Sequence, residues 1–479
     1  MNFDLVIGGA KVIDGSGRAA FQADVGVTGD RIAEVGNLGT KQSSRALDGA
    51  GLVLAPGFID VHTHDDRAVL ATPHMTPKVS QGVTSVVVGN CGISLSPIAM
   101  TSNPPPPLNL IGDQSDYRFS SFSDYARAFH EAAPAVNVAA LIGHSSLRAG
   151  AMDQLDRPAS EKEINKMAAD LDAALAGGAI GLSSGLDYPP AKEAEEQEVA
   201  RLCAPLAQRG GIYTTHMRDE GDEIMAALEE TFRVGRTAQV PIVISHKKCA
   251  GHRNWGRSKE TLQAIALARQ DLTIELDCYP YIASSTVLLA KYLDRTEEVL
   301  ITWSDPYPEC AGRHLSQIAA EWGCSIFTAA ERLAPAGAIY FQMDEGDLQR
   351  IMTFDGTMIG SDGLPHDKQP HPRLWGTFPR VLGHYCRDLG LLELEQAVHR
   401  MTGKPASVFG LEGRGEIRPG AYADLILFDP DKIIDKATFA EPCQAADGIE
   451  AVLVNGQIVW QDKCHSGAGP GQLLRRKAR

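Results

Sequence analysis

The sequence predicts a (β/α)8 barrel that carries a small β-sandwich domain and one inserted subdomain. Two patterns lead to this fold. Between residues 52 and 362, eight short apolar segments alternate with amphipathic helical segments, which is typical of βα units around a parallel sheet. The two ends of the chain instead contain short strand-like segments separated by Gly and Asn turns. Eight parallel strands close into a barrel, and the two ends together form a further β domain.

The eight predicted barrel strands are short, and most of them end at a polar residue. They cover residues 52–61, 83–91, 136–142, 179–184, 211–216, 241–246, 272–279 and 357–362. Helical segments at 160–176, 193–208 and 220–238 fit between them, and Ser160 supplies a capping signal for the first. In such barrels the carboxyl ends of the strands form the active-site face.

The chain divides into three predicted regions. Residues 1–55 and 414–479 form the small β-sandwich domain, and residues 56–413 form the catalytic barrel. Between strands seven and eight, residues 285–350 are too numerous for one helix and its loops. They predict an inserted subdomain, which is a candidate lid over the active site.

Four shorter segments carry local predictions. Residues 4–13 read as a strand, a Gly-Gly turn and a second strand. Residues 103–108 (NPPPPL) predict a stiff loop over the mouth of the barrel. A hairpin is expected at Asn455–Gly456, and the basic tail 473–479 is expected to fray.

Composition and charge limit the partners. The formal net charge is -15 and the pI is about 5.4, which argues against nucleic acid or an anionic membrane surface as a partner. The N-terminus lacks the features of a signal peptide, and no apolar run reaches membrane-spanning length. The nine cysteines are scattered without CxxC pairs, which predicts a reducing, cytoplasmic location.

Six residues of metal-ligating type are predicted at carboxyl ends of barrel strands. They are His62, His64, Cys91, His216, His246 and Asp362. Each alone has a simple structural explanation, because His and Asp often end strands and a free Cys is usually part of the core. Six together at one face of a barrel are hard to explain that way. His144 also ends a strand and could line the pocket, but it is not proposed as a metal ligand.

The chemistry of this set indicates hydrolysis. His62 and His64 are two residues apart on a strand, so their rings point the same way. Thiolate and imidazole ligands favour zinc over magnesium or calcium, and zinc makes a bound water acidic. Asp362 is the only carboxylate among the six and is therefore the expected general base and acid.

Several of these segments resemble the amidohydrolase superfamily. They are residues 56–64 (PGFIDVHTH), the later strand-end histidines, 361–363 (SDG) and 415–425 (GEIRPGAYADL). Within that superfamily, four motifs are similar to those of the D-aminoacylases, the N-acyl-D-amino-acid deacylases. These are residues 89–94 (GNCGIS), 215–221 (THMRDEG), 244–248 (ISHKK) and 360–366 (GSDGLPH).

The resemblance implies how the metals are held. Many two-metal members carry a carbamylated lysine at the end of strand four, where this chain has residues 182–185 (LSSG) and no lysine. In the D-aminoacylases a cysteine at the end of strand two serves instead, and Cys91 matches it. By that resemblance Cys91, His216 and His246 bind one zinc ion tightly. His62, His64 and Asp362 form a weaker second site.

The resemblance also implies the reaction and the substrate. The expected activity is zinc-dependent hydrolysis of N-acyl-D-amino acids to a carboxylate and a free D-amino acid. Lys248, Tyr279 and Arg373 are expected to bind the free carboxylate of the substrate, because they offer charged and neutral hydrogen-bond donors. The preference for D-substrates is inherited from the family alone. The protein is expected to act as a monomer or small homo-oligomer.

Two features bear on side-chain preference, and two rival functions stay open. Asp187, if it faces the pocket, would disfavour acidic side chains and could favour neutral or cationic ones. Residues 340–343 (YFQM) either line the pocket or form subdomain core. The first rival is a cyclic-amide hydrolase or deaminase of the same superfamily. The second is a non-catalytic relative that has kept only the barrel. A turnover screen with hydantoins and nucleobases separates the first, and zinc analysis separates the second.

Overall fold

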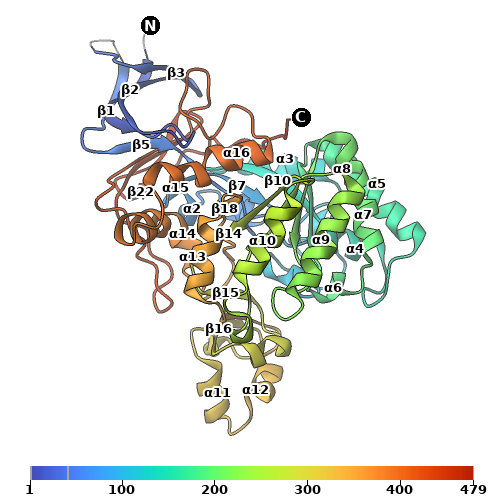
Figure 1. Cartoon of the computed structure of the whole chain (residues 1–479). Helices are drawn as coiled ribbons and strands as arrows, with labels where there is room; N and C mark the ends of the chain where they lie inside the picture. The colour runs from blue at the N-terminus through green and yellow to red at the C-terminus, as the bar shows by residue number, and fades with distance from the viewer. Residues whose placement is uncertain (1–2, 40–42, 478–479) are drawn as a thin grey trace.

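The computed structural model describes residues 3–39 and 43–477, and its centre is an eight-stranded parallel barrel (Figure 1). In chain order the barrel strands are β6 (Phe58–Asp60), β7 (Val83–Val88), β10 (Asn137–Gly143), β11 (Gly181–Gly185), β12 (Ile212–His216), β13 (Ile242–Ile244), β14 (Ile274–Cys278) and β18 (Thr357–Ile359). Neighbours in sequence are neighbours in the sheet. A bridge between Thr63 and Gly363 brings the first and last strands together. The predicted barrel is confirmed.

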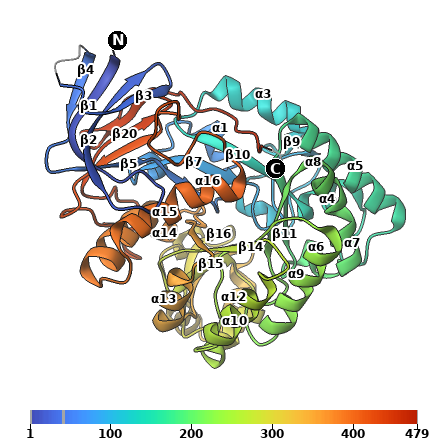
Figure 2. The ribbon, with the colours of Figure 1, turned by 45° about the horizontal axis from the view of Figure 1, so that its top comes forward.

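The helices lie outside the strands (Figure 2). They are α1 (Ala68–Ala71), α2 (Thr76–Val79), α3 (Phe122–Ala132), α4 (His144–Ala151), α5 (Glu161–Gly177), α6 (Pro189–Lys192), α7 (Glu196–Leu202), α8 (Ala204–Arg209), α9 (Ile224–Ala238), α10 (Ser258–Ala268), α13 (Glu345–Thr353), α14 (Arg373–Arg380), α15 (Leu394–Met401) and α16 (Gly403–Phe409), with a π-helix at Val381–Asp388. Ser160 and Glu163 form the predicted capping box of α5. The predicted helix 193–208 is divided into α7 and α8.

The first predicted strand is in fact two strands in two different sheets. Strand β5 (Val53–Pro56) pairs with the small domain, and β6 begins after Gly57 in the barrel. A Cβ atom at Gly57 would lie 2.1 Å from the side chain of Thr84, so only glycine fits where the chain passes between the sheets. The apolar run looked continuous because both strands are buried.

Strands from both ends of the chain form the small domain, as predicted (Figure 2). Its sheet contains β1 (Phe3–Val12), β2 (Phe21–Thr28), β3 (Arg31–Gly36), β4 (Ser43–Asp48), β5, β19 (Leu425–Phe428), β20 (Ile449–Val454), β21 (Gln457–Gln461) and β22 (Cys464–His465). Antiparallel pairing of β5 with β19 joins the two halves, and both contribute to one apolar core. The predicted turn at Gly8–Gly9 is wrong, because β1 continues through a bulge there. The hairpin at Asn455–Gly456 is confirmed.

The connection after β14 contains a separate subdomain, which projects from the barrel in Figure 1. Strands β15 (Ala283–Val287), β17 (Ala336–Phe341) and β16 (Glu298–Ser304) form an antiparallel sheet in that order. Helices α11 (Leu315–Glu321) and α12 (Ile326–Leu333) pack on it and complete a core of their own. The predicted insertion is therefore present, and α13 after it belongs to the barrel, where it contacts α10 and β18.

Two further predictions concern loops and the tail. Leu110, just after the proline-rich run 103–108, reaches the wall of the central pocket. The strands that flank this loop in sequence, β8 (Ile98–Ala99) and β9 (Arg118–Phe119), pair with each other. The expected fraying of the tail is wrong for 473–477, because Leu474 donates a backbone hydrogen bond to Val138 and Arg476 binds Gly210. Within the described residues, no helix is both long and apolar enough to span a membrane. We keep 1–55 plus 414–479 and 56–413 as the proposed domain division.

Candidate metal centre and active site

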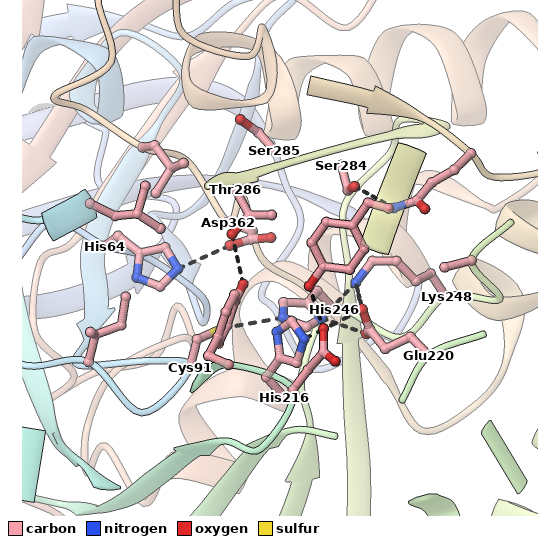
Figure 3. A pocket seen from close by; sticks show the side chains of 18 of the residues that line it. His64, Cys91, His216, Glu220, His246, Lys248, Ser284, Ser285, Thr286 and Asp362 are labelled. Atoms are coloured by element: carbon pink, nitrogen blue, oxygen red, sulfur yellow. Dashed lines mark hydrogen bonds and ion pairs between the residues drawn. The ribbon is translucent and has the colours of Figure 1, made fainter. Parts of the chain in front are cut away.

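The carboxyl ends of the barrel strands bring all six predicted ligands together in one buried site. Figure 3 shows His64, Cys91, His216, His246 and Asp362 at this site. His62, His64, Cys91 and Asp362 form one group whose donor atoms lie within 4.8 Å of one another. Cys91 also forms a second such group with His216 and His246. Every one of these side chains is buried. The thiol of Cys91 is therefore shared by two neighbouring candidate metal sites.

The distances place ring nitrogens around this thiol. Cys91 Sγ lies 3.2 Å from His62 Nε2 and 3.3 Å from His246 Nε2. Asp362 Oδ1 lies 3.2 Å from His64 Nε2 and 3.5 Å from His62 Nε2. Lone-pair donors from several strands thus point at the same small volume, which is the arrangement that a cation requires.

Backbone strain marks three of the six residues. Cys91, His246 and Asp362 have φ angles of 52°, 34° and 51°, in the left-handed region that non-glycine residues seldom adopt. Each of the three follows the end of its strand, so the turn in the chain directs the side chain into the site. Strain of this kind persists where the surrounding structure holds it, and it is concentrated at functional sites.

The protonation of the donors fits a metal ion. Burial lowers the pKa of His62 and of His216 to about 3, so both rings are neutral, the form that ligates metals. Burial raises the pKa of the Cys91 thiol well above its usual value, so a thiolate here needs a cation beside it. Nδ1 of His64 and of His216 has no hydrogen-bond partner among the described residues. The donor set is the thiolate and imidazole combination that zinc prefers.

Asp277 and a buried ion-pair network support the ligands from beneath. Asp277 Oδ1 lies 3.3 Å from His62 Nδ1 and accepts a 2.8 Å hydrogen bond from the backbone N–H of His246. Lys78 donates to Asp60 and to Ser361, both at 2.8 Å. Asp60 in turn accepts from the backbone N–H of Ser361, next to Asp362. These contacts fix the strand ends that carry the ligands.

Two cations lie beside the candidate ligands. Arg373 is fully buried and forms an ion pair of 2.9 Å with Asp362. Burial raises the pKa of Asp362, but Arg373 and His62 outweigh it and hold that pKa well below its usual range. Lys248 donates to both oxygens of Glu220 at 2.8 Å. The ring of Tyr279 lies near both cations, 4.5 Å from the Arg373 guanidinium and 5.7 Å from the Lys248 ammonium.

The inserted subdomain supplies much of the pocket wall. Its contribution consists of Ser284, Ser285, Thr286, Tyr292, Arg295 and Gln342. Ile93, Leu110 and Leu364 are apolar residues of the wall. Of the three predicted carboxylate-binding residues, Lys248 reaches the pocket wall, and Tyr279 and Arg373 lie behind it. Of residues 340–343, Gln342 lines the pocket and Tyr340 belongs to the subdomain core.

Asp187 does face the pocket, but it does not offer a free negative charge. Lys291 Nζ lies 2.7 Å from its Oδ1, and the hydroxyl of Tyr292 donates to its other oxygen. Arg295 lies 3.9 Å from Asp219 nearby. Acidic and basic side chains therefore alternate in this part of the site and largely compensate one another.

Sequence reasoning missed Glu220 and Asp277, and it left open whether His144 lines the pocket. Glu220 seemed to start a helix, but α9 begins at Ile224 and leaves the carboxylate at the pocket. Its position four residues after His216, in THMRDEG, was the available signal. Asp277 lies one residue before the end of β14. His144 does not line the pocket and instead binds Glu198 at 2.8 Å.

Comparison with known proteins places the chain in a family. Residues 45–272 and 349–460 match the model described as the amidohydrolase family. The chain belongs to the amidohydrolase family. The stretch between the two matched segments contains the inserted subdomain. The D-aminoacylase of Alcaligenes xylosoxydans xylosoxydans is 54% identical over 478 residues, which cover 99% of this chain and 98% of that relative. The N-acyl-D-aspartate deacylase of the same organism is 49% identical, covering 98% and 95%.

Solved structures of this family have the same fold as the chain. A crystal structure of D-aminoacylase matches with a TM-score of 0.97 at 55% identity and covers 99% of this chain and 100% of its own. The N-acyl-D-glutamate deacylase from Bordetella bronchiseptica, complexed with zinc and a phosphonate inhibitor, matches with a TM-score of 0.96 at 46% identity and covers 99% and 100%. The chain is thus an amidohydrolase of the D-aminoacylase group, a hydrolase that acts on amides.

Proposed function

We propose that this protein is a zinc-dependent N-acyl-D-amino-acid deacylase, which cleaves the amide bond to give a carboxylate and a free D-amino acid. The observation that carries the proposal is the thiol of Cys91 between two groups of imidazoles, with Asp362 beside it and two buried cations, Arg373 and Lys248, close by. Relatives named for D-aminoacylase and N-acyl-D-aspartate deacylase activity support it. The zinc bound by the deacylase from Bordetella bronchiseptica supports the choice of metal.

In this proposal Cys91, His216 and His246 hold the tight zinc ion, and His62, His64 and Asp362 form a weaker second site. The binuclear metal centre of a D-aminoacylase, with one-metal activation and second-metal attenuation in that protein, supports two unequal sites. Bound here, zinc would supply a Lewis acid that polarises the acyl carbonyl and acidifies a water molecule.

Asp362 moves the proton in the proposed reaction. The Arg373 ion pair keeps it ionised, so it starts as a carboxylate that accepts a proton from the attacking water. The water oxygen bonds to the acyl carbon, and Asp362 then gives the proton to the amide nitrogen as the C–N bond breaks. One carboxyl group therefore serves as base and then as acid.

Lys248, Tyr279 and Arg373 bind the free carboxylate of the substrate in this proposal. Arg373 Nε is buried without a hydrogen-bond partner among the described residues, and the Tyr279 hydroxyl contacts only Met343 Sδ at 3.8 Å. Arg373 Nε therefore has an unused N–H for an incoming anion, and the Tyr279 O–H can exchange its weak sulfur acceptor for a carboxylate oxygen. Because the Lys291 ion pair compensates the charge of Asp187, we propose neutral D-amino acids, rather than cationic ones, as the favoured substrates.

Metal removal tests the proposal. Chelator-treated protein is expected to lose hydrolysis of N-acetyl-D-methionine and to regain it with zinc, as measured by release of the free amine. Hydantoins and nucleobases, assayed in parallel, are expected to stay intact. Ring opening or deamination at a higher rate than deacylation would replace the proposal. The proposed reaction requires a small-molecule substrate and no macromolecular partner. We also propose a cytoplasmic location, which the scattered cysteines support.

A further inference from the structure

Glu220 lies beside both a candidate metal ligand, His246, and a candidate substrate-binding residue, Lys248 (Figure 3). It follows β12 and precedes α9, and its backbone carbonyl accepts a 2.7 Å hydrogen bond from Ala250. Its largely buried carboxylate lines the pocket and lies 3.0 Å from His246 Nδ1 and 2.8 Å from Lys248 Nζ. It belongs to neither group of candidate ligands.

The position of one proton shows what this carboxylate does for His246. The ring turns Nε2 toward Cys91 Sγ, at 3.3 Å, so Nε2 is the nitrogen available to a metal ion. A neutral imidazole that ligates through Nε2 carries its hydrogen on Nδ1 and needs an acceptor there. Two groups of the described chain lie within hydrogen-bond distance of Nδ1, and Lys248 Nζ can only donate. Glu220 is therefore the acceptor that selects the ligating tautomer.

The hydrogen on His246 Nδ1 also determines how many hydrogen bonds Lys248 can donate to its neighbours. The ammonium has three hydrogens, and the two oxygens of Glu220, both at 2.8 Å, take two of them. Nδ1 of His246 lies 2.8 Å away but cannot accept the third while it carries its own hydrogen. The third hydrogen is left for an anion in the pocket.

We propose that Glu220 is a positioning residue that couples metal binding to substrate binding. One carboxylate orients His246 for the metal and holds the Lys248 ammonium so that its free hydrogen meets the substrate carboxylate. This inference rests on the proposed deacylase function and adds a role for a residue that touches neither reacting atoms nor metal.

Zinc affinity tests the His246 half on metal-free protein, by competition with a chelator of known affinity. Glu220→Ala removes the acceptor, and its zinc Kd is expected to rise about 10- to 100-fold. Glu220→Gln keeps one acceptor oxygen and is expected to show a smaller rise. Glu198→Gln is the matched control, because Glu198 is also buried against a cation and a histidine, Arg148 and His144, but lies outside the pocket. Its zinc Kd is expected to stay within about twofold of the wild type.

KM for N-acetyl-D-methionine, measured on zinc-saturated enzyme, tests the Lys248 half. Glu220→Gln and Lys248→Met are each expected to raise KM. Because Glu220 acts on substrate through Lys248, the double variant is expected to match Lys248→Met alone. A loss of packing unrelated to Lys248 would instead multiply the two effects.

The outcomes separate this inference from the proposed function. An unchanged zinc Kd in Glu220→Ala, or multiplied KM effects in the double variant, would overturn the coupling while wild-type deacylation stands. If Glu220→Ala does not fold, the nearly isosteric Glu220→Gln decides through its KM. A wild-type protein that does not hydrolyse N-acetyl-D-methionine overturns the proposed function instead, and the zinc titration still decides what Glu220 does for His246.

Discussion

The two sides of the pocket are built in different ways. The candidate ligands sit on strand ends of one closed sheet, where the backbone N–H of Asp362 binds the carbonyl of His62 across the first and last strands. The facing wall comes from the inserted subdomain, which has its own sheet and core and lies between the two segments that match the family model. The candidate ligands thus stand on the closed barrel, whereas much of the wall that faces them belongs to a subdomain with a core of its own.

Loss of Cys91 should have the largest effect, because both candidate metal sites share its thiol. Cys91→Ala is expected to lose the tight zinc and all measurable deacylation, as tested by metal analysis and amine release. Cys203→Ala removes an equally buried thiol outside the site and should keep both. If Cys91→Ala still binds one zinc ion tightly per chain, the assignment of Cys91 as a metal ligand at the barrel strand ends is wrong.

Asp362→Asn should come next. It removes the proton acceptor but leaves the ligands of the tight site, Cys91, His216 and His246, unchanged. The kcat is therefore expected to fall about 10²- to 10⁴-fold with the tight zinc retained. The control is Asp367→Asn, a buried carboxyl nearby that is outside both ligand groups. If Asp362→Asn turns over at close to the normal rate, the general base must be another residue.

Lys78→Met is expected to destabilise the buried ion-pair network that Lys78 forms with Asp60 and Asp65 beneath the ligands. This change leaves Asp60 and Asp65 buried without their cation, whose distances to them are 2.8 and 3.3 Å. The free energy of unfolding is expected to fall by about 3–5 kcal/mol, measured by denaturant unfolding of zinc-loaded protein. Adding Asp60→Asn should recover part of the loss. An unchanged midpoint would mean that the network does not stabilise the strand ends.

The smallest effect is expected on the wall. Asp187→Asn releases Lys291 from its ion pair, so N-acetyl-D-glutamate should gain relative to N-acetyl-D-methionine by roughly 10-fold, as for one modest pocket contact. Kinetics on both substrates measure the ratio. Asp294→Asn, an exposed change in the inserted subdomain three residues after Lys291, should leave the ratio unaltered. A constant ratio in Asp187→Asn would place side-chain selection elsewhere.

The barrel and its six candidate ligands were predictable from sequence because both follow local rules. Strand ends of a barrel converge, and His62, Cys91 and Asp362 stand where a strand pattern stops. Glu220 and Asp277 were missed because their roles depend on residues that only packing brings near. The division of one apolar run at Gly57 was missed for a similar reason, since it depends on the side chain of Thr84 in another strand.

One comparison tests the central claim most directly: hydrolysis of N-acetyl-D-methionine and N-acetyl-L-methionine, side by side, on enzyme whose zinc content has been measured. The account predicts rapid release of the free amine from the D-substrate alone, with about one tight zinc ion per chain. Equal turnover of both, or none of either with zinc bound, would contradict the assignment of this site as an N-acyl-D-amino-acid deacylase.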